Sequence, residues 1–166
     1  MISIDLGDIT ILDCDAIVNA ANKTLLGGGG VDGAIHRRAD RELLAECRTL
    51  GGCETGEAKI TKGYNLKAKY VIHTVGPICS TQKNQASLLA NCYKNSLDLA
   101  LKHDIHSIAF PAISTGVYHY PLEEATKIAI STVKTWLDMH KDYKLDIIFS
   151  CFDEKTYNMY QRYLEA

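Results

Sequence analysis

The sequence lacks any long apolar run. No segment of the 166-residue chain approaches the roughly 20 consecutive apolar residues that a membrane-spanning helix needs. Residues 1–5 also lack the basic and apolar regions of a secretory signal peptide. We therefore expect no membrane association and a cytoplasmic protein, or a nuclear one if the source is eukaryotic.

The chain also lacks an excess of basic residues. Its 18 Lys and Arg against 20 Asp and Glu give a net charge of −2 with His counted neutral. Proteins that hold nucleic acids by the backbone usually carry a basic excess or a basic stripe. This balance argues against an RNA-end phosphatase or an RNA-associated regulator. It still permits a small anionic ligand, which a few backbone N–H groups and a helix end can hold.

Several signatures of cysteine, metal and serine chemistry are missing. The six cysteines form no C-x-x-C pair, and we expect reduced thiols, several of them in the core. His, Cys and acidic residues do not cluster at zinc-ligand spacing. Ser114 is not framed as G-x-S-x-G, and no cysteine has a defensible acid–base partner. We expect neither a metal nor a cofactor, so any hydrolysis would use an activated water.

Strand-like and helix-like segments alternate from end to end. We expect strands at 2–6, 16–20, 57–61, 70–75, 107–110 and 145–151. Helices are expected at 32–48, 84–103, 121–137 and 153–164. No linker and no repeat interrupts this order. It predicts one domain spanning residues 1–166, an α/β three-layer sandwich with a mixed, mostly parallel central sheet.

The most informative segment is NAANKTLLGGGGVDGAIHR, residues 19–37. Two carboxamides, Asn19 and Asn22, and four consecutive glycines stand between a strand-like and a helix-like run. Polyglycine costs backbone entropy and adds nothing to a core, so it suits a place where the backbone must approach something closely. A strand that ends in such a loop and opens into a helix is a site for phosphate. With Asp32 just beyond, the segment predicts a phosphorylated ligand with a polar reactive end.

A second polar, glycine-bearing turn covers residues 114–117 and also follows a strand. In sheets of this class, ligands bind beyond the carboxyl ends of the strands. We therefore expect the loops at 22–33 and 114–118 to meet at one edge of the sheet.

Two familiar phosphate motifs fit poorly. Residues 28–33 match G-x-G-x-x-G, but residues 22–26 separate them from the strand, and the region near residue 53 reads as a loop. Residues 51–56 have the glycine spacing of a P-loop, yet Glu57 stands where Lys is needed. The glycine loop is therefore of another kind.

The polar residues of this region also have plainer interpretations. Asn19 and Asn22 could end a strand and cap a turn. Asp32 could be the N-cap of the following helix, a role compatible with facing a ligand. His36, one turn beyond, could pair with Asp32 or act directly. His73 lies in a strand and is expected to be a satisfied core histidine.

Five segments together resemble the macrodomain family, and within it the MacroD-type ADP-ribosyl-ester hydrolases, which include bacterial O-acetyl-ADP-ribose deacetylases. The segments are GDIT at 7–10, AIVNAAN at 16–22, GGGGVDGAIHR at 27–37, HTVGP at 73–77 and FPAISTGVY at 110–118. They occur in order, and the match covers nearly the whole chain. Residues 38–41 depart from the family's usual continuation.

The resemblance implies a set of ligand contacts. Asp8 should accept a hydrogen bond from the adenine amino group with Ile9 beside it, and Phe152 should stack near the adenine. Backbone N–H groups should hold the diphosphate and the distal ribose, and Asn19 is also expected among the ligand-binding residues. The residues expected to supply those N–H groups are Gly30, Val31, Ser114, Thr115, Gly116, Val117 and Tyr118.

The resemblance also implies a reaction. Asn22 should bind the distal ribose, Asp32 should position or activate the attacking water, and His36 should support Asp32. The expected activity is removal of ADP-ribose from acidic side chains of modified proteins, together with deacetylation of O-acetyl-ADP-ribose. We expect a monomer. The alternative is a reader module that binds ADP-ribose without hydrolysis, since some macrodomains only bind.

Overall fold

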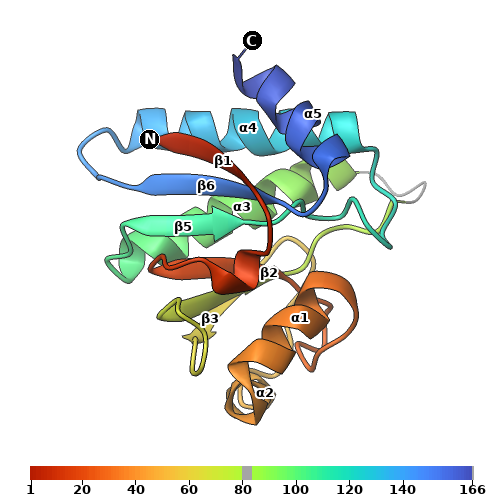
Figure 1. Cartoon of the computed structure of the whole chain (residues 1–166), viewed down its shortest axis with the longest axis vertical. Coiled ribbons are helices and arrows are strands. Elements are labelled where there is room, and N and C mark those ends of the chain that lie inside the picture. Colours follow the sequence, from red (N-terminus) through yellow and green to blue (C-terminus); the bar gives the residue numbers. More distant parts are fainter. Residues whose placement is uncertain (80–83, 166) are drawn as a thin grey trace.

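A six-stranded sheet forms the centre of the fold (Figure 1). The computed structural model describes residues 1–79 and 84–165. The strand order is β1-β6-β5-β2-β4-β3, with β3 antiparallel to β4 and the other neighbours parallel. The strands are β1 (Ile2–Leu6), β2 (Ala16–Ala20), β3 (Ala58–Lys62), β4 (Tyr70–Thr74), β5 (Ser107–Phe110) and β6 (Asp146–Cys151). The prediction of a mixed, mostly parallel sheet is confirmed.

Helices cover both faces of this sheet (Figure 1). One face carries α3 (Gln85–Lys102), α4 (Leu122–Met139) and α5 (Glu154–Glu165). The other carries α1 (Gly30–Ala39), α2 (Arg41–Arg48) and the short 3₁₀ helix η1 (Ile9–Ile11). The result is the predicted three-layer arrangement.

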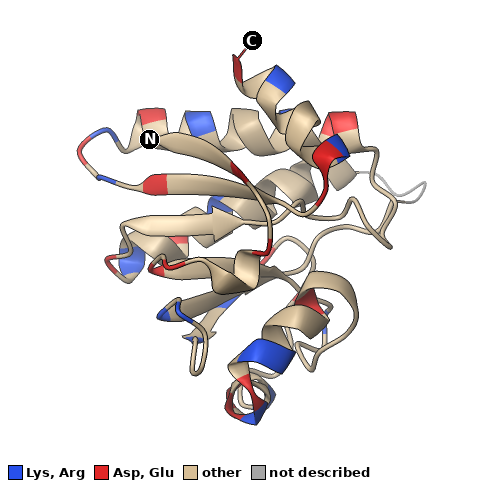
Figure 2. Cartoon of the chain, in the orientation of Figure 1, with Lys and Arg blue, Asp and Glu red and all other residues tan. Residues whose placement is uncertain are grey.

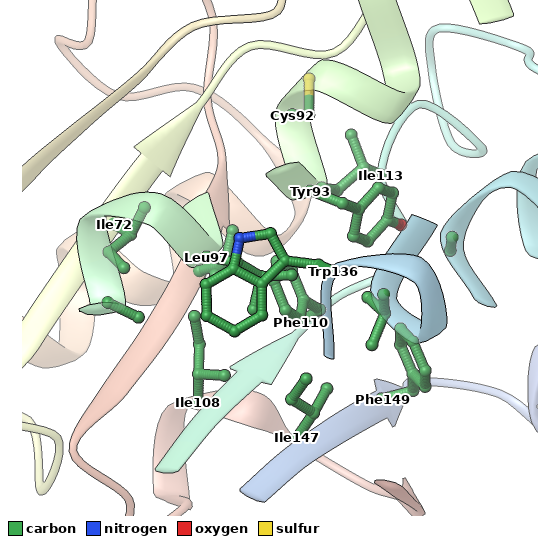
Figure 3. Packing of buried hydrophobic residues seen from close by; sticks show 14 of the residues in the cluster. Ile72, Cys92, Tyr93, Leu97, Ile108, Phe110, Ile113, Trp136, Ile147 and Phe149 are labelled. Carbon is green, nitrogen blue, oxygen red and sulfur yellow. The ribbon is translucent and has the colours of Figure 1, made fainter. Parts of the chain in front are cut away.

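The larger core lies between the sheet and α3, α4 and α5. The rings of Tyr93, Phe110 and Phe149 pack in a row, with 5.0 Å between the first two centroids and 6.3 Å between the last two (Figure 3). Trp136 of α4 is 4 % exposed and donates its indole N–H to Asp98 of α3 over 2.9 Å. These aromatic side chains bury much of the apolar surface that holds the layer together.

The smaller core lies under α1 and α2. Ile17 of β2 and Val71 of β4 point into it, and side chains alternate along a strand, so Asn19 and His73 share that face. Thr61 of β3 joins them through a hydrogen bond to the His73 ring. This face therefore carries buried polar groups among apolar ones.

One expected element is wrong. The sequence predicts a single helix from residue 32 to 48, but the structure has two helices that meet at Asp40. Asp40 has φ 71°, outside the helical region, and its carboxylate caps α2 by accepting from the Arg41 N–H at 2.8 Å. An aspartate tolerates this conformation better than most residues because its short side chain can bond locally.

Charged residues are dispersed over the ribbon. In the view of Figure 2, Lys and Arg are interspersed with Asp and Glu instead of gathering on one element. No helix within residues 1–79 and 84–165 combines the length and hydropathy that crossing a bilayer would require.

Candidate active site at the carboxyl edge of the sheet

Two loops begin at the carboxyl ends of neighbouring strands. The glycine loop follows β2, and the polar turn at 114–118 follows β5, which pairs with β2 in parallel. The segment after β4 joins the same edge, because the Cys79 N–H donates to the Tyr118 carbonyl over 2.7 Å. The expected meeting of the two loops at one edge is confirmed.

The glycine loop packs closely on the start of α1. A Cβ on Gly33 would lie 2.5 Å from the Gly28 carbonyl oxygen, so only glycine allows the loop to approach the helix here. A Cβ on Gly28 would lie 3.1 Å from Asp32 Oδ2 and 3.4 Å from Asn22 Nδ2. Gly28 therefore lies against both polar side chains.

Asp32 does not cap the helix. The N-cap of α1 is Gly29, and Asp32 stands inside the first turn, where a carboxylate interacts favourably with the helix dipole. Its side chain is nearly buried, at 4 % exposure for the residue. Oδ1 accepts a hydrogen bond from Asn19 Nδ2 at 2.9 Å. Among the described residues nothing donates to Oδ2, which faces Gly28.

His36 lies one turn along α1 from Asp32. Its Nε2 is 3.4 Å from Asp32 Oδ1, but the geometry leaves this nitrogen without a hydrogen-bond partner. The two side chains lie against each other across i and i+4 of the helix. The structure thus supports the paired interpretation of His36.

Asn19 and His73 lie beneath Asp32. Asn19 is fully buried, and its Nδ2 is 3.2 Å from His73 Nδ1 as well as 2.9 Å from Asp32. The pKa of His73 is lowered to about 4, chiefly by burial and also by the nearby His36 ring, while Asp32 opposes the shift. His73 is a satisfied core histidine, as expected. Its contact with Asn19 was not anticipated, because it depends on β2 and β4 being neighbours.

Asn22 holds the turn that leads into the glycine loop. Its Nδ2 donates to the Gly27 carbonyl at 3.0 Å, and its Oδ1 accepts from the Thr24 N–H and hydroxyl at 3.2 and 2.6 Å. The turn-capping interpretation is therefore confirmed. Its Nδ2 also faces Gly28 on the side where Asp32 lies, so the predicted contact with a distal ribose stays a prediction.

The turn after β5 exposes its backbone. Within residues 1–79 and 84–165, no protein acceptor bonds the N–H groups of Thr115, Gly116 and Val117. Val117 is 85 % exposed, whereas Ser114 is buried with φ 67° and packs against Gly76. Unpaired N–H groups on a glycine-bearing turn form an anion-binding surface.

Asp8 and Phe152 lie at the far end of this edge. The Gly7 N–H donates to the Cys151 carbonyl at 2.9 Å. This bond continues the pairing of β1 with β6, so Asp8 and Phe152 lie beside each other just after the two strands. Hydrogen bonds from the Thr10 hydroxyl and N–H keep the pKa of Asp8 below its usual value. Phe152 is 86 % exposed, while Ile9 is buried in the smaller core.

Three buried polar atoms lack a hydrogen-bond partner in the part of the chain that the structure describes. They are Asn19 Oδ1, His36 Nε2 and Ser114 Oγ. All three lie at the carboxyl edge, around Asp32 or in the turn after β5. Because an unsatisfied buried polar group is costly, its presence points to a role other than stability.

Buried thiols and clusters of metal-binding residue types offer no competing centre in the described part of the chain. Burial raises the pKa of Cys47 and Cys53 to about 11 and that of Cys151 to about 12, so these thiols stay protonated near neutral pH. Among the residues described, no group of three or more His, Cys, Asp or Glu could hold a metal ion.

Comparisons with known proteins agree with this geometry. Residues 18–129 match the family model described as Macro domain. The chain is 59 % identical to "Macro domain-containing protein mll7730" of Mesorhizobium japonicum over 99 % of its own length and 94 % of that protein. It is 58 % identical to ADP-ribose glycohydrolase MACROD1 of Rattus norvegicus, covering 98 % of this chain and 64 % of the relative.

Solved structures are similarly close. The Trypanosoma brucei macrodomain in complex with ADP-ribose is 48 % identical, with a TM-score of 0.94 over 98 % of this chain and 68 % of that one. The Oceanobacillus iheyensis macrodomain is 45 % identical, with a TM-score of 0.93 over 98 % and 89 %. That protein has also been solved with a substituted asparagine, glycine or aspartate.

Proposed function

The chain belongs to the Macro domain family, and from this premise we propose that it binds ADP-ribose and hydrolyses the ester at the distal ribose. The acyl group would be an acidic side chain of a modified protein or the acetyl group of O-acetyl-ADP-ribose. The relatives support this proposal, since they include ADP-ribose glycohydrolase MACROD1 and a macrodomain in complex with ADP-ribose.

The order of groups along the carboxyl edge carries the proposal. Asp8 and Phe152 follow β1 and β6, the exposed turn follows β5, and the glycine loop follows β2. Adjacent strands are about 5 Å apart, so the series extends over roughly 15 Å. An adenine site, a diphosphate site and a ribose site therefore succeed one another, in the order of the moieties of ADP-ribose.

The reactive end would lie over Asp32. Asn19 and His36 both approach Oδ1, which leaves Oδ2 as the oxygen that faces the glycine loop and Asn22. A water beside Oδ2 would give up its proton to this carboxylate as it attacks the ester. The bond between the acyl carbon and the ribose oxygen then breaks, and that oxygen takes the proton from Asp32, so the products are a free acid and ADP-ribose with its hydroxyl restored. General-base assistance of this kind is typically worth roughly 10²- to 10⁴-fold in rate.

Substituted forms of the Oceanobacillus iheyensis macrodomain point to the corresponding residues of this chain as the ones that matter for the site. The asparagine, glycine and aspartate substituted there have the same spacing along the chain as Asn22, Gly29 and Asp32 here. Asn22 is oriented by hydrogen bonds with the Gly27 carbonyl and with Thr24. A fixed carboxamide beside a fixed carboxylate suits the orientation of a sugar hydroxyl and an attacking water.

A reader module would need only the binding groups. The partly free Asp32 carboxylate next to Asn22 favours the hydrolase, because a site that only binds has no use for a buried base. The test compares the wild type with Asp32→Asn, and Asp40→Asn serves as a control on the same segment. A glutamate-ADP-ribosylated protein and O-acetyl-ADP-ribose are separate substrates, which distinguishes the two sources of the acyl group.

We expect Asp32→Asn to cut turnover at least a hundredfold while ADP-ribose binding changes by only a few fold. Asp40→Asn should retain full turnover because Asp40 lies at the end of α1 remote from the glycine loop. Binding without release by the wild type would show a reader module.

A further inference from the structure

A row of four buried polar side chains crosses the sheet under α1. It runs from Asp32 of α1 through Asn19 of β2 and His73 of β4 to Thr61 of β3. The successive contacts are 2.9, 3.2 and 2.9 Å, and each of the four residues is at most 4 % exposed. The mechanism above uses Asp32 and the Asn19 hydrogen bond to it, so His73 and Thr61 need a separate explanation.

The hydrogen bonds of this row have one direction. His73 Nε2 lies 2.9 Å from the Thr61 hydroxyl and 3.8 Å from Cys47 Sγ. The Thr61 hydroxyl donates to the Lys62 carbonyl at 3.1 Å, so toward the ring it acts as the acceptor of an Nε2–H. Burial keeps the His73 ring neutral near pH 7 by lowering its pKa to about 4. A neutral ring carries a single proton. His73 Nδ1 is therefore an acceptor, and it faces Asn19 Nδ2.

This direction fixes the Asn19 amide. One hydrogen of its Nδ2 goes to His73 Nδ1 and the other to Asp32 Oδ1. Rotating the amide by half a turn would place its oxygen against two acceptors, at the cost of two buried hydrogen bonds. The ring and the Asp32 carboxylate therefore favour the same orientation of the amide, with its donor facing both.

We propose that His73 is a positioning residue, which acts through the Asn19 amide to hold the Asp32 carboxylate with Oδ2 facing the ligand. The inference rests on the proposed function and adds to it the group that orients the base. His73 itself is fully buried and lies two contacts away from Oδ2, so it does not touch the substrate. Thr61 contributes by fixing the tautomer of the ring.

The test uses two substitutions that differ in one acceptor. In His73→Asn the side-chain oxygen stands where Nδ1 stood and can accept from Asn19. In His73→Leu no acceptor remains. We expect His73→Leu to lower kcat roughly tenfold, the effect of losing one buried hydrogen bond, and His73→Asn to restore most of it. The Kd for ADP-ribose should stay within about twofold in both variants, because His73 is fully buried and does not touch the ligand.

Two further measurements separate positioning from general damage. Val71→Ala opens a cavity on the same strand without touching the row, and it should lower stability while leaving kcat unchanged. Thr61→Val removes the acceptor at the end of the row in a nearly isosteric way, and Thr61→Ser restores it. Should His73→Leu fail to fold, a loss of kcat in Thr61→Val that is recovered in Thr61→Ser supports the same inference.

The possible failures are distinguishable. Equal turnover in the wild type and His73→Leu, or equal losses in His73→Leu and His73→Asn, would overturn the positioning role alone. A wild-type protein that binds ADP-ribose but releases none from the ester substrates would overturn the proposed function and, with it, this inference.

Discussion

Acidification should destabilise the fold through His73. The ring is fully buried, and burial lowers its pKa from 6.5 to about 4, with His36 adding to the shift and Asp32 opposing it. Between these two pH values the unfolded chain binds a proton that the folded chain does not. The free energy of unfolding therefore falls as the pH drops from about 6.5 toward 4, and the stabilisation is fully present above 6.5.

The size of this effect follows from the shift. At about 1.4 kcal/mol per pH unit, the loss between pH 7.5 and pH 4.5 should be about 2 to 3 kcal/mol. Urea unfolding of the wild type and of His73→Asn at both pH values isolates the contribution of this ring, since the other titrating groups are shared. The wild type should lose about 2 to 3 kcal/mol more than the variant on acidification. Equal losses in the two proteins would refute the assignment of His73 as a buried neutral ring.

Three further predictions concern substitutions outside the row. Gly33→Ala should lower the free energy of unfolding by about 1–3 kcal/mol and weaken ADP-ribose binding, because its Cβ would meet the Gly28 carbonyl. Gly29→Ala is the control, since its Cβ would have no neighbour within 4 Å, and thermal unfolding should show a much smaller loss of stability. Phe152→Ala should leave stability unchanged and weaken ADP-ribose binding roughly tenfold by calorimetry, with ribose 5-phosphate as the unaffected control ligand. Both Asp40→Gly and Asp40→Ala remove the capping carboxylate, but glycine adopts φ 71° without strain, so Asp40→Gly should unfold no more easily than the wild type, whereas Asp40→Ala should lose about 1 kcal/mol.

The sheet and its functional edge were readable from the sequence. Alternating strands and helices require crossover connections that make neighbouring strands parallel, and parallel strands present their carboxyl ends together. The two glycine-bearing loops follow predicted strands and therefore had to lie on that edge. The long β2-to-α1 glycine run also identified Asp32 and Asn22 as the polar pair beside it, and the structure places both against Gly28.

The break between α1 and α2 was not readable. Apolar residues recur at helical spacing on both sides of Asp40, so periodicity alone predicts one helix. The break depends on a single residue with φ 71° and on its capping bond to Arg41. Aspartate also occurs inside helices, so an aspartate at position 40 does not by itself predict that the helix ends there.

The hydrogen-bonded row of Asn19, His73 and Thr61 behind Asp32 also could not be predicted from the sequence. Asn19, Thr61 and His73 come from three strands, and their contacts depend on β4 lying between β2 and β3. The strand order depends on packing between distant segments, which local pattern does not specify. His73 could be recognised as buried, but its partner Asn19 could not.

The most direct test of the central claim is the release of free ADP-ribose from a glutamate-ADP-ribosylated protein, measured for the wild type and Asp32→Ala together with ADP-ribose binding by both. We predict release by the wild type alone, with binding retained in both, because Asp32 assists the attacking water rather than holding the ligand. If binding and release fell together in Asp32→Ala, Asp32 would be a binding residue and the claim would be contradicted.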